Sequence, residues 1–434
     1  MVRSEVAMAQ TVPHKNIILR AGAPVYGGYT LGRTAAVPKI ILIRGAIPGE
    51  MVEVSVNEEK KDYYIASVEN VIEPSEYRIQ PKCASFEACG GCQFQYISYG
   101  EQVVIKQQVL TDSLRRIGNI IVAPDTPIIN EDAIWKYRFR GQFKVENGLI
   151  GFYKEKSNEI VDTDYSPLMI DPINEALKSV RSAMSAQPEL FRDINEIQIS
   201  CGDGTYASIK ANPRAKHDRL FWDSLADLLL ECCFEGVFIK TQLETLKYGR
   251  QYLALSLDGI SYTASPMSFF QSNWKLNRVM VDFIKDRLQP LSGKRVLDLF
   301  SGAGNFSLPL AQDADEVIAV EENPFAVEDG KRNLRLNRIQ NMCFYRAAAE
   351  AYDISRYSPF DIVIVDPPRA GLSPKIVENL LQAHPATIVY ISCNPSTLAR
   401  DLKRLAPNYE IESIRLVDLF PQTYHIETLV FLAK

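Results

Sequence analysis

The sequence has no apolar run long enough to cross a membrane, although 46% of its 434 residues are hydrophobic. Such a crossing takes about 20 apolar residues in succession, so we expect no membrane partner. The first ten residues also lack the basic segment and apolar stretch of a secretory signal. We therefore expect a cytoplasmic protein, acting as a monomer.

An excess of positive charge is also missing. The 48 Lys and Arg residues are outnumbered by 53 Asp and Glu residues, and the formal net charge is -5. A strongly basic surface attracts nucleic acid through its overall field. Any RNA binding by this chain must instead come from local basic patches.

Cysteine is too sparse for a disulfide scaffold, with eight residues in the chain. Three of them, Cys83, Cys89 and Cys92, lie close together in the sequence. Thiolates at this spacing are typical of a zinc or iron–sulfur site in a reducing compartment. Structural sites usually have four protein ligands, and the fourth could be Cys201 or one of Cys232–Cys233. The alternative is three cysteines packed in a core.

The first residues, to about residue 14, are expected to form a loose tail. The predicted first domain takes residues 12–75 and is small and all-β. Strands are expected near 39–43, 51–56 and 65–72, separated by Gly and Pro turns. Several short strands in this length predict a small closed barrel. With Lys60, Lys61 and nearby tyrosines, it is either an oligonucleotide-binding barrel or a structural module with a solvated face.

Residues 76–265 form a second predicted domain, of mixed α+β type. The segment 135–140 alternates basic and aromatic residues, so as a strand it would place its basic side chains on one face, to hold RNA or simply to be solvated. Helices are expected in this domain near 100–117, 172–185 and 218–232, and strands near 142–152, 196–200, 206–211, 236–241 and 252–257.

Strands and helices alternate regularly in residues 266–434, which predicts a Rossmann-like, doubly wound parallel sheet. In such sheets ligands and reactive groups gather at the carboxyl ends of the strands. A helix is expected at 275–287, and strands at 295–300, 317–320, 361–365, 386–391, 412–418 and 427–432.

A glycine-rich turn follows the first of these strands. Gly302 and Gly304 permit close approach of a ligand at the start of a helix. Glu321 ends the next strand, at the place from which a carboxylate binds ribose hydroxyls. Ser307 stands where the dinucleotide fingerprint has its third glycine, which favours a ligand with adenosine but no pyrophosphate, such as S-adenosylmethionine. An ordinary turn in an unrelated fold is the alternative.

Cys393 follows the strand 386–391 and precedes Asn394 and Pro395, so it should lie on a strand-to-helix turn. Asp366 and Glu427 also fall at or near strand ends of the same sheet. A nucleophilic thiol needs a lowered pKa or a neighbouring base, and a carboxylate can supply the base. The alternatives are a buried core cysteine, a capping Asp366 and a solvated Glu427.

Five segments together resemble the RNA 5-methyluridine methyltransferase family: SFFQSN, VLDLFSGAGNFSLPLA, VDPPRAGL, YISCNPSTLARDL and HIETLVFL. The barrel resembles that family's TRAM domain, and CASFEACGGCQFQ resembles its iron–sulfur motif. The resemblance implies S-adenosylmethionine-dependent methylation of carbon 5 of a uridine in RNA. It favours 23S ribosomal RNA, with the tRNA T-loop as the alternative.

The resemblance also implies roles for single residues. Cys393 would add to carbon 6 of uracil, and Glu427 would remove the carbon-5 proton after methyl transfer. Asp366 would hold the base or position the reacting groups, and Arg369 would support its turn. The uridine would have to leave its stack. The residues expected at the cofactor are Gln271, Asp298, Phe300, Gly302, Gly304, Asn305, Glu321 and Asp366.

One position departs from the family pattern. The fourth cluster cysteine of the family precedes a proline, and here Ser166 stands in that place. Thiolate is a better ligand than serine oxygen for iron–sulfur clusters, so the occupant of this site is undecided. Ser166 could ligate the fourth iron, another cysteine could take its place, or the site could hold a different metal or none. We expect the three clustered cysteines to lie close in space.

Two other functions compete with this interpretation. A non-catalytic RNA-binding protein would not need the nucleophile, base and cofactor turn that are all present. An amino-group methyltransferase would carry an aromatic residue where this chain has Arg369, and would not need Cys393.

Overall fold

A computed structural model describes residues 16–35, 37–257 and 259–434. The chain divides into two compact units. The predicted tail and the predicted start of the first domain at residue 12 lie outside the described residues. The smaller unit takes the described part of Met1–Pro81 with Gln93–Val109 and Gln422–Tyr424, and the larger takes Lys82–Cys92, Leu110–Pro421 and His425–Lys434.

The smaller unit contains a curled six-stranded sheet in the order β1-β5-β6-β4-β3-β2. The two end strands are consecutive in the chain, and the Gly22 N–H, between them, donates to the Leu31 carbonyl of β3. The sheet thus closes on itself, and the prediction of a small barrel is confirmed. The strands are β1 (Ile17–Arg20), β2 (Pro24–Val25), β3 (Tyr29–Gly32), β4 (Ile40–Arg44), β5 (Met51–Glu59) and β6 (Tyr63–Glu73).

A buried ion pair joins the barrel to the chain that follows it. Glu50, whose side chain is fully buried, accepts two hydrogen bonds of 2.6 Å from the Arg78 guanidinium. The Ile47 and Ser75 amides donate to the same carboxylate. Burial by itself would raise the pKa of Glu50, but these bonds outweigh it and the pKa is lowered.

Replacing Arg78 by alanine is expected to destabilise the barrel by about 3 kcal/mol, because it leaves a buried carboxylate without its cation. Hydrogen exchange of the β5 and β6 amides, read by mass spectrometry in the full chain, measures this local stability. Lys39→Ala, which breaks the exposed pair with Glu59, is the control and should change exchange little.

The same pair should make the barrel sensitive to acid. The folded pKa of Glu50 lies below its ordinary value of 4.5. The stabilisation is therefore fully present above that value and is lost as pH falls through the lower folded pKa. Unchanged exchange in Arg78→Ala at neutral pH would contradict both expectations.

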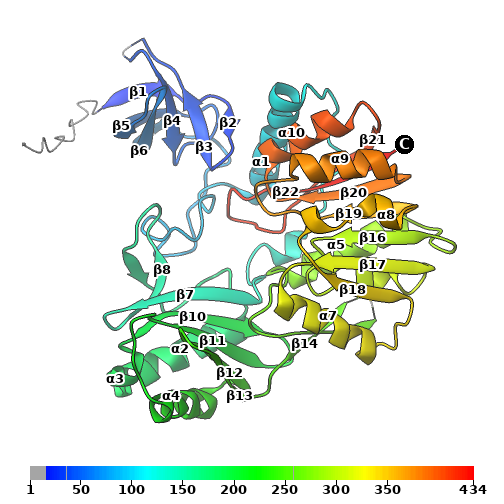
Figure 1. The fold of residues 1–434 in the computed structure, drawn as a ribbon. Helices are drawn as coiled ribbons and strands as arrows, with labels where there is room; N and C mark the ends of the chain where they lie inside the picture. The colour runs from blue at the N-terminus through cyan, green and yellow to red at the C-terminus, as the bar shows by residue number, and fades with distance from the viewer. Residues whose placement is uncertain (1–15, 36, 258) are drawn as a thin grey trace, which may run out of the picture. The chain divides into compact units, whose positions relative to one another are not determined.

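The larger unit contains a seven-stranded sheet in the order β13-β12-β11-β10-β7-β8-β9. Helices α2 and α4 cover one face of it (Figure 1), where their apolar side chains form one core with the sheet. The elements are β7 (Arg140–Glu146), β8 (Leu149–Tyr153), β9 (Ile160–Asp162), α2 (Asp171–Ala186), α3 (Pro188–Phe191), β10 (Ile194–Cys201), β11 (Thr205–Ala211), α4 (Arg219–Cys232), β12 (Gly236–Lys240) and β13 (Thr245–Gly249).

Two sequence predictions fail in this region. The strand expected at 142–152 is a hairpin, because Asn147 and Gly148 both adopt positive φ and turn the chain between β7 and β8. The segment 135–139 is not a strand, since Lys136 has φ of 49°. Its amides bond instead to the carbonyls of Pro167, Leu168 and Ser272, so the expected shared basic face does not exist.

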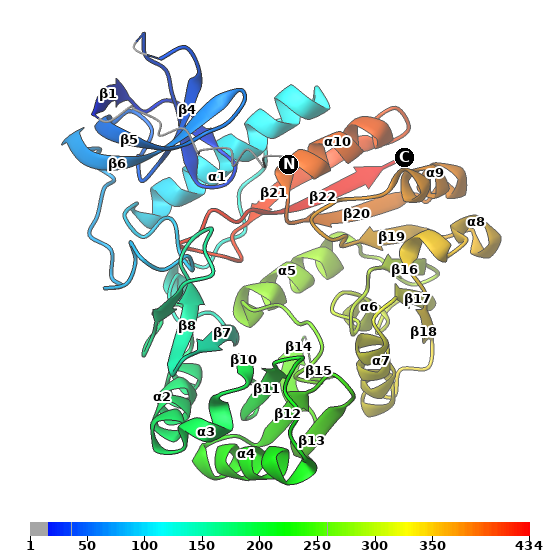
Figure 2. The same cartoon turned by 60° about the vertical axis from the view of Figure 1, so that its left-hand side comes forward.

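A second seven-stranded sheet in the larger unit has the order β18-β17-β16-β19-β20-β22-β21. Helices α9 (Pro374–Ala383) and α10 (Pro395–Leu405) lie on one face, and α5 (Trp274–Arg287) and α7 (Pro324–Leu336) on the other (Figure 2). The prediction of a doubly wound fold is therefore confirmed. The prediction of a fully parallel sheet is wrong, because β22 (Glu427–Ala433) runs antiparallel to both of its neighbours. A short connection without a helix joins β21 to β22 and cannot carry the chain back for a parallel pairing.

These elements are α5 (Trp274–Arg287), β16 (Arg295–Leu299), α6 (Ser307–Leu310), β17 (Glu316–Glu321), α7 (Pro324–Leu336), β18 (Met342–Arg346), η3 (Ala349–Ala351), α8 (Ile354–Tyr357), β19 (Ile362–Val365), α9 (Pro374–Ala383), β20 (Thr387–Ser392), α10 (Pro395–Leu405), β21 (Glu410–Val417) and β22 (Glu427–Ala433). The hairpin β14 (Leu253–Leu257) and β15 (Ile260–Ala264) precedes them, and α1 (Tyr99–Ser113), η1 (Leu114–Gly118) and η2 (Glu131–Ala133) come earlier in the chain.

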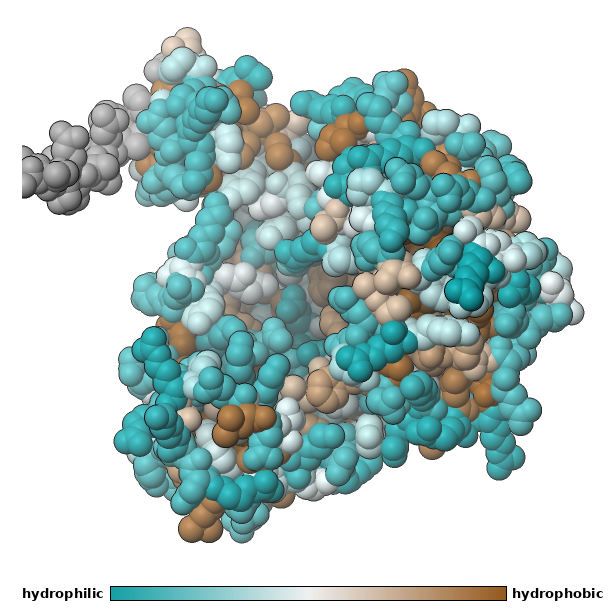
Figure 3. All heavy atoms as spheres, in the orientation of Figure 1, coloured by the Kyte–Doolittle hydropathy of each residue, from teal (hydrophilic) through white to brown (hydrophobic). Residues whose placement is uncertain are grey.

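The surface seen in Figure 3 is mostly hydrophilic, with apolar side chains in small groups. None of the helices in the described parts of the chain has both the length and the apolar character that a membrane crossing requires. The predicted domain boundaries at residues 75–76 and 265–266 stay a proposal.

Candidate active site

The sheet register brings Cys393, Asp366 and Glu427 together at the end of the sheet where its parallel strands finish. Ser392 lies opposite Thr428, so Cys393 and Glu427 are adjacent across β20 and β22. Val365 lies beside Tyr390, which places Asp366 next to the end of β20. Because β22 is antiparallel, its first residue lies where the parallel strands end. The three side chains predicted for catalysis therefore converge.

Burial and mutual repulsion set the charges of this group. Glu427 is only 6% exposed, and burial together with nearby Asp366 raises its pKa well above the ordinary value. Burial also raises the pKa of Asp366 to about 7. The pair therefore holds a proton more readily than two separate carboxylates, and Glu427 is a stronger base than an exposed glutamate.

The thiol of Cys393 responds to the same surroundings. Burial, and then the charges of Glu427 and Asp366, raise its pKa to about 11, while Arg369 lowers it. The resting thiol is therefore protonated at neutral pH and needs a base to become a nucleophile. The adjacent carboxylates are the groups placed to act as that base.

The alkylation of Cys393 by iodoacetamide should accelerate with pH up to about pH 11, because only the thiolate reacts. Glu427→Gln should lower the apparent pKa, since it removes a negative charge that disfavours the thiolate. Mass spectrometry of the tryptic peptide 376–400, which contains no other cysteine, measures the rate. Cys343, on the edge strand β18, is the internal control, and an unshifted titration would contradict the argument.

Arg369 lies on the loop after β19 with its guanidinium near this group. Its charge lowers the pKa of both Cys393 and Glu427, and its Nη2 lies 3.4 Å from His425 Nδ1. Sequence reasoning gave Arg369 only a supporting role in the turn. The structure adds an electrostatic one.

The glycine-rich turn has the features of a ligand site. Gly302 has φ of 56°, and a Cβ added there would meet no atom within 4 Å, so a ligand can approach the backbone. Glu321 accepts hydrogen bonds from the Gly302 amide at 2.9 Å and the Asn323 amide at 2.7 Å. The predicted ribose carboxylate is therefore held directly beside the turn.

Buried polar atoms below the turn support a bound ligand. Asp298, Ser301 and Ser307 are all buried there, and the Ser301 hydroxyl has no hydrogen-bond partner among the described residues. Burial raises the pKa of Asp298 to about 7, although hydrogen bonds from Ser307 lower it, and the charges of Asp366 and Glu321 raise it further. Unpaired buried polar atoms are costly, so this set fits a polar, positively charged cofactor.

Two predicted cofactor residues have other contacts. Asn305 exchanges amide hydrogen bonds of 2.7 and 2.9 Å with Asn277 on α5, which ties the turn to that helix. Phe300 has φ of 63°, a conformation that aromatic residues rarely adopt, and its ring packs with the core on the α9–α10 face. The backbone of Phe300 is therefore strained at the start of the turn, and its role at the cofactor stays a prediction.

Gln271 lies half-buried in the loop before α5. Arg140 donates to the Ser268 carbonyl at 2.8 Å, and Gln198 donates to the Pro266 carbonyl at 2.8 Å. The segment that carries Gln271 is thus attached to β7 and β10. Burial lowers the pKa of Arg140 to about 10, and this arginine is a structural clamp rather than an exposed RNA contact.

Asp329 on α7 was missed by sequence reasoning. It is 2% exposed and accepts a hydrogen bond of 2.8 Å from the Ser265 amide, which ties the same loop to α7. Burial raises its pKa to about 6. The signal in the sequence is an acidic residue on the face of 324–336 that also carries Ala326, Val327 and Gly330.

The cysteine segment has weaker support. The Cys83 and Cys89 thiols interact, which adds to the effect of burial in raising the pKa of Cys89. No group of three or more His, Cys, Asp or Glu side chains among the described residues is arranged to hold a metal. Ser166 is buried, with its backbone bonded to the Asn174 side chain. The residues as placed do not fit a four-iron cluster.

A doubly wound sheet with this turn, and with a cysteine beside two carboxylates where its parallel strands end, is the arrangement of an enzyme that binds a nucleotide-like cofactor. A sequence model of a family described as tRNA (uracil-5-)-methyltransferase matches residues 239–434. The relatives described next match nearly the whole chain at 34% identity, and the chain therefore belongs to this family of RNA uracil-C5 methyltransferases.

Several known proteins are similar over nearly the whole chain. An RNA methyltransferase of Aquifex aeolicus is 34% identical, over 94% of this chain and 96% of its own. The 23S rRNA (uracil(1939)-C(5))-methyltransferase RlmD of Shewanella amazonensis is 34% identical, over 90% of this chain and 89% of its own. The solved tRNA (uracil-54, C5)-methyltransferase of Pyrococcus abyssi, in complex with S-adenosyl-L-homocysteine, superposes with a TM-score of 0.76 at 25% identity, over 96% and 99% of the two chains.

Proposed function

We propose that the protein methylates carbon 5 of a uridine in 23S ribosomal RNA, with S-adenosylmethionine as methyl donor. The observation that carries the proposal is the convergence of Cys393, Glu427 and Asp366 at the sheet edge that also holds the glycine-rich turn. The relatives named for 23S rRNA are more similar in sequence than the tRNA enzyme, which favours the ribosomal substrate.

The residues suggest the following sequence of events. The Cys393 thiol gives its proton to a neighbouring carboxylate and adds to carbon 6 of uracil, which makes carbon 5 electron-rich. S-adenosylmethionine supplies the methyl group that carbon 5 receives. Glu427, which is ionised because the thiol proton went to Asp366, removes the carbon-5 proton. The bond from carbon 6 to sulfur then breaks and releases the product and the Cys393 thiolate. The thiolate takes its proton back from Asp366, and the proton on Glu427 passes to solvent.

The other site residues position the reactants. Glu321 and the Gly302 backbone would hold the cofactor ribose, and Asp298 would face the positively charged end of the cofactor. Asp366 and Gln271 would hold the edge of the uracil. The barrel would bind the surrounding RNA through local basic and aromatic side chains. The expectations of a monomer and of the cytoplasm stay predictions.

The proposal is tested with RNA that contains 5-fluorouridine. Fluorine at carbon 5 cannot be removed as a proton, so the covalent complex should persist on a denaturing gel when S-adenosylmethionine is present. Transcripts of 23S rRNA and of tRNA are compared. Trapping on the ribosomal transcript supports the proposal. Trapping on tRNA alone would transfer the function to the T-loop uridine. No trapping on either RNA would contradict a covalent mechanism.

The cysteine segment stays a proposed iron–sulfur site on its spacing and resemblance alone, since its side chains as described are not gathered around a common centre. If a cluster binds, Ser166→Cys should raise the iron retained by anaerobically purified protein, because it restores a fourth thiolate. Iron and sulfide analysis measures this. Less than about one iron per chain in both proteins would rule the cluster out.

A further inference from the structure

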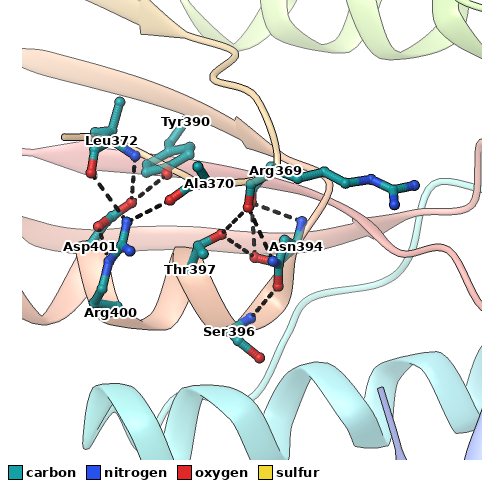
Figure 4. Close-up of polar contacts among 10 residues, drawn as sticks. Arg369, Ala370, Leu372, Tyr390, Asn394, Ser396, Thr397, Arg400 and Asp401 are labelled. Carbon is teal, nitrogen blue, oxygen red and sulfur yellow. Dashed lines mark hydrogen bonds and ion pairs between the residues drawn. The ribbon is translucent and has the colours of Figure 1, made fainter. Parts of the chain in front are cut away.

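Asp401 is a fully buried carboxylate on α10, the helix that begins two residues after Cys393. Its Oδ2 accepts hydrogen bonds from the Leu372 amide at 2.8 Å and from the Tyr390 hydroxyl at 2.9 Å (Figure 4). Its Oδ1 accepts from Arg400 Nε at 2.9 Å. One side chain therefore joins β20, α10 and the loop after β19.

The same loop is held at further points along its backbone. Arg400 Nη2 donates to the carbonyls of Ala370 at 2.9 Å and Leu372 at 3.2 Å. The Arg369 carbonyl accepts from Asn394 Nδ2 at 3.1 Å and from the Thr397 hydroxyl at 3.2 Å. Figure 4 shows the backbone of Arg369 inside this network while its side chain extends away from it.

Gly371 shows how closely the loop approaches α10. It has φ of 74°, and a Cβ there would lie 2.5 Å from Asp401 Oδ2 and 2.8 Å from Arg400 Nη2. Only glycine permits this approach. The loop is therefore in direct contact with the helix and not merely near it.

A carboxylate is unexpected on this face of the helix. Its neighbours Leu398, Leu402 and Leu405 are all fully buried, and an ionised group among them is costly unless it is well paired. The three donors to Asp401 supply that pairing. These bonds also fix the arrangement of the chain around Cys393, because each donor belongs to a different part of it.

We propose that Asp401 is a positioning residue that holds Arg369 beside Cys393 and Glu427. This inference rests on the proposed function. Asp366 directly follows β19 and is fixed by that strand, whereas Arg369 lies further out and depends on the contacts with α10. Loss of Asp401 should therefore move Arg369 more than Asp366. Since Arg369 favours the charged forms of the thiol and of Glu427, its displacement would disfavour the thiolate.

The first test is Asp401→Asn in the full chain. An amide has one accepting oxygen and an NH₂ group that cannot accept, so at least one of the three donors loses its bond. The pH at which Cys393 in peptide 376–400 becomes reactive to iodoacetamide should rise by about half a pH unit. Turnover should fall by about tenfold to a hundredfold, while the calorimetric Kd for S-adenosylmethionine stays within about twofold, because the glycine-rich turn is untouched.

A double-mutant cycle shows whether Asp401 acts through Arg369. Arg369→Ala alone should raise the apparent pKa of the thiol, and adding Asp401→Asn to it should produce no further shift. Tyr390→Phe removes one donor to Asp401 and keeps the volume, so it should give a smaller shift in the same direction. That variant decides the matter if Asp401→Asn does not fold.

The matched control is Asp361→Asn. Asp361 directly precedes β19 and accepts hydrogen bonds from the Arg295 amide at 2.9 Å and from Lys294 at 3.1 Å. It therefore lies at the opposite end of the strands from Cys393, and its loss should leave the thiol titration unchanged. If Asp401→Asn or Tyr390→Phe lowers only the melting temperature and Cys393 titrates as in the wild type, the positioning role is wrong. These titrations need no RNA, so failure of the proposed function would appear separately, as absence of trapping by the wild type.

Discussion

Replacing Cys393 by alanine is expected to abolish methylation, with a loss of about 10⁴-fold or more in turnover. Without the thiol, carbon 5 of uracil is too poor a nucleophile to take the methyl group. The variant should also fail to form a covalent complex with 5-fluorouridine-containing 23S rRNA. Methyl transfer from labelled S-adenosylmethionine and denaturing gels measure the two losses.

The controls for this prediction separate chemistry from folding. Cys393→Ala should bind S-adenosylmethionine with a Kd near that of the wild type, because the glycine-rich turn follows a different strand, β16. Cys343→Ala, which changes an exposed cysteine on the edge strand, should keep full activity. A Cys393→Ala protein that still traps RNA would refute the assignment of the nucleophile.

Replacing Glu427 by glutamine is expected to stop the reaction after methyl transfer. Glutamine has nearly the same shape but cannot take the carbon-5 proton, and a residue that is only 6% exposed leaves little room for water to replace it. Turnover should fall by about 10²- to 10⁴-fold. A covalent complex with ordinary uridine RNA should accumulate, because elimination needs the proton removed first.

This accumulation distinguishes Glu427 from Cys393, whose loss prevents the complex altogether. Because Glu427→Gln also removes a charge that raises the thiol pKa, formation of the complex should not be slowed. Glu410→Gln, at the opposite end of the neighbouring strand β21, is the control and should turn over normally. Rapid product release by Glu427→Gln would mean that another group, with Asp366 the first to examine, removes the proton.

Much of the fold could be predicted from local patterns. The alternation of apolar residues and the Gly and Pro turns gave the strands of the barrel and the regular strand–helix succession after residue 266. The errors fell where a local signal was overlooked or where the partners lie far away in the chain. Residues 142–152 were predicted as one strand although Asn147-Gly148 is typical of a hairpin turn, and both residues adopt positive φ. The segment 135–139 has strand-like alternation but bonds to two separate parts of the chain.

The residues of the candidate site also divide into those that the sequence predicted and those that it did not. Cys393, Asp366 and the glycine-rich turn could be assigned because each follows a strand directly in the sequence. Asp329 and Asp401 were missed. Helical periodicity places both on inward faces, where an acidic residue looks like an exception, and the donors that explain it are the Ser265 amide for Asp329 and the Leu372 amide and Tyr390 hydroxyl for Asp401.

The sequence by itself determined the chemistry of this protein: a thiol after one strand, a carboxylate after another, and a turn suited to an adenosine-containing cofactor. The tertiary structure decided how these groups meet. The antiparallel course of β22 places Glu427 beside Cys393, and the contacts of Asp401 hold the Arg369 loop against α10. The physical reason is that strand direction and buried hydrogen bonds depend on partners far away in the chain, which no local pattern records.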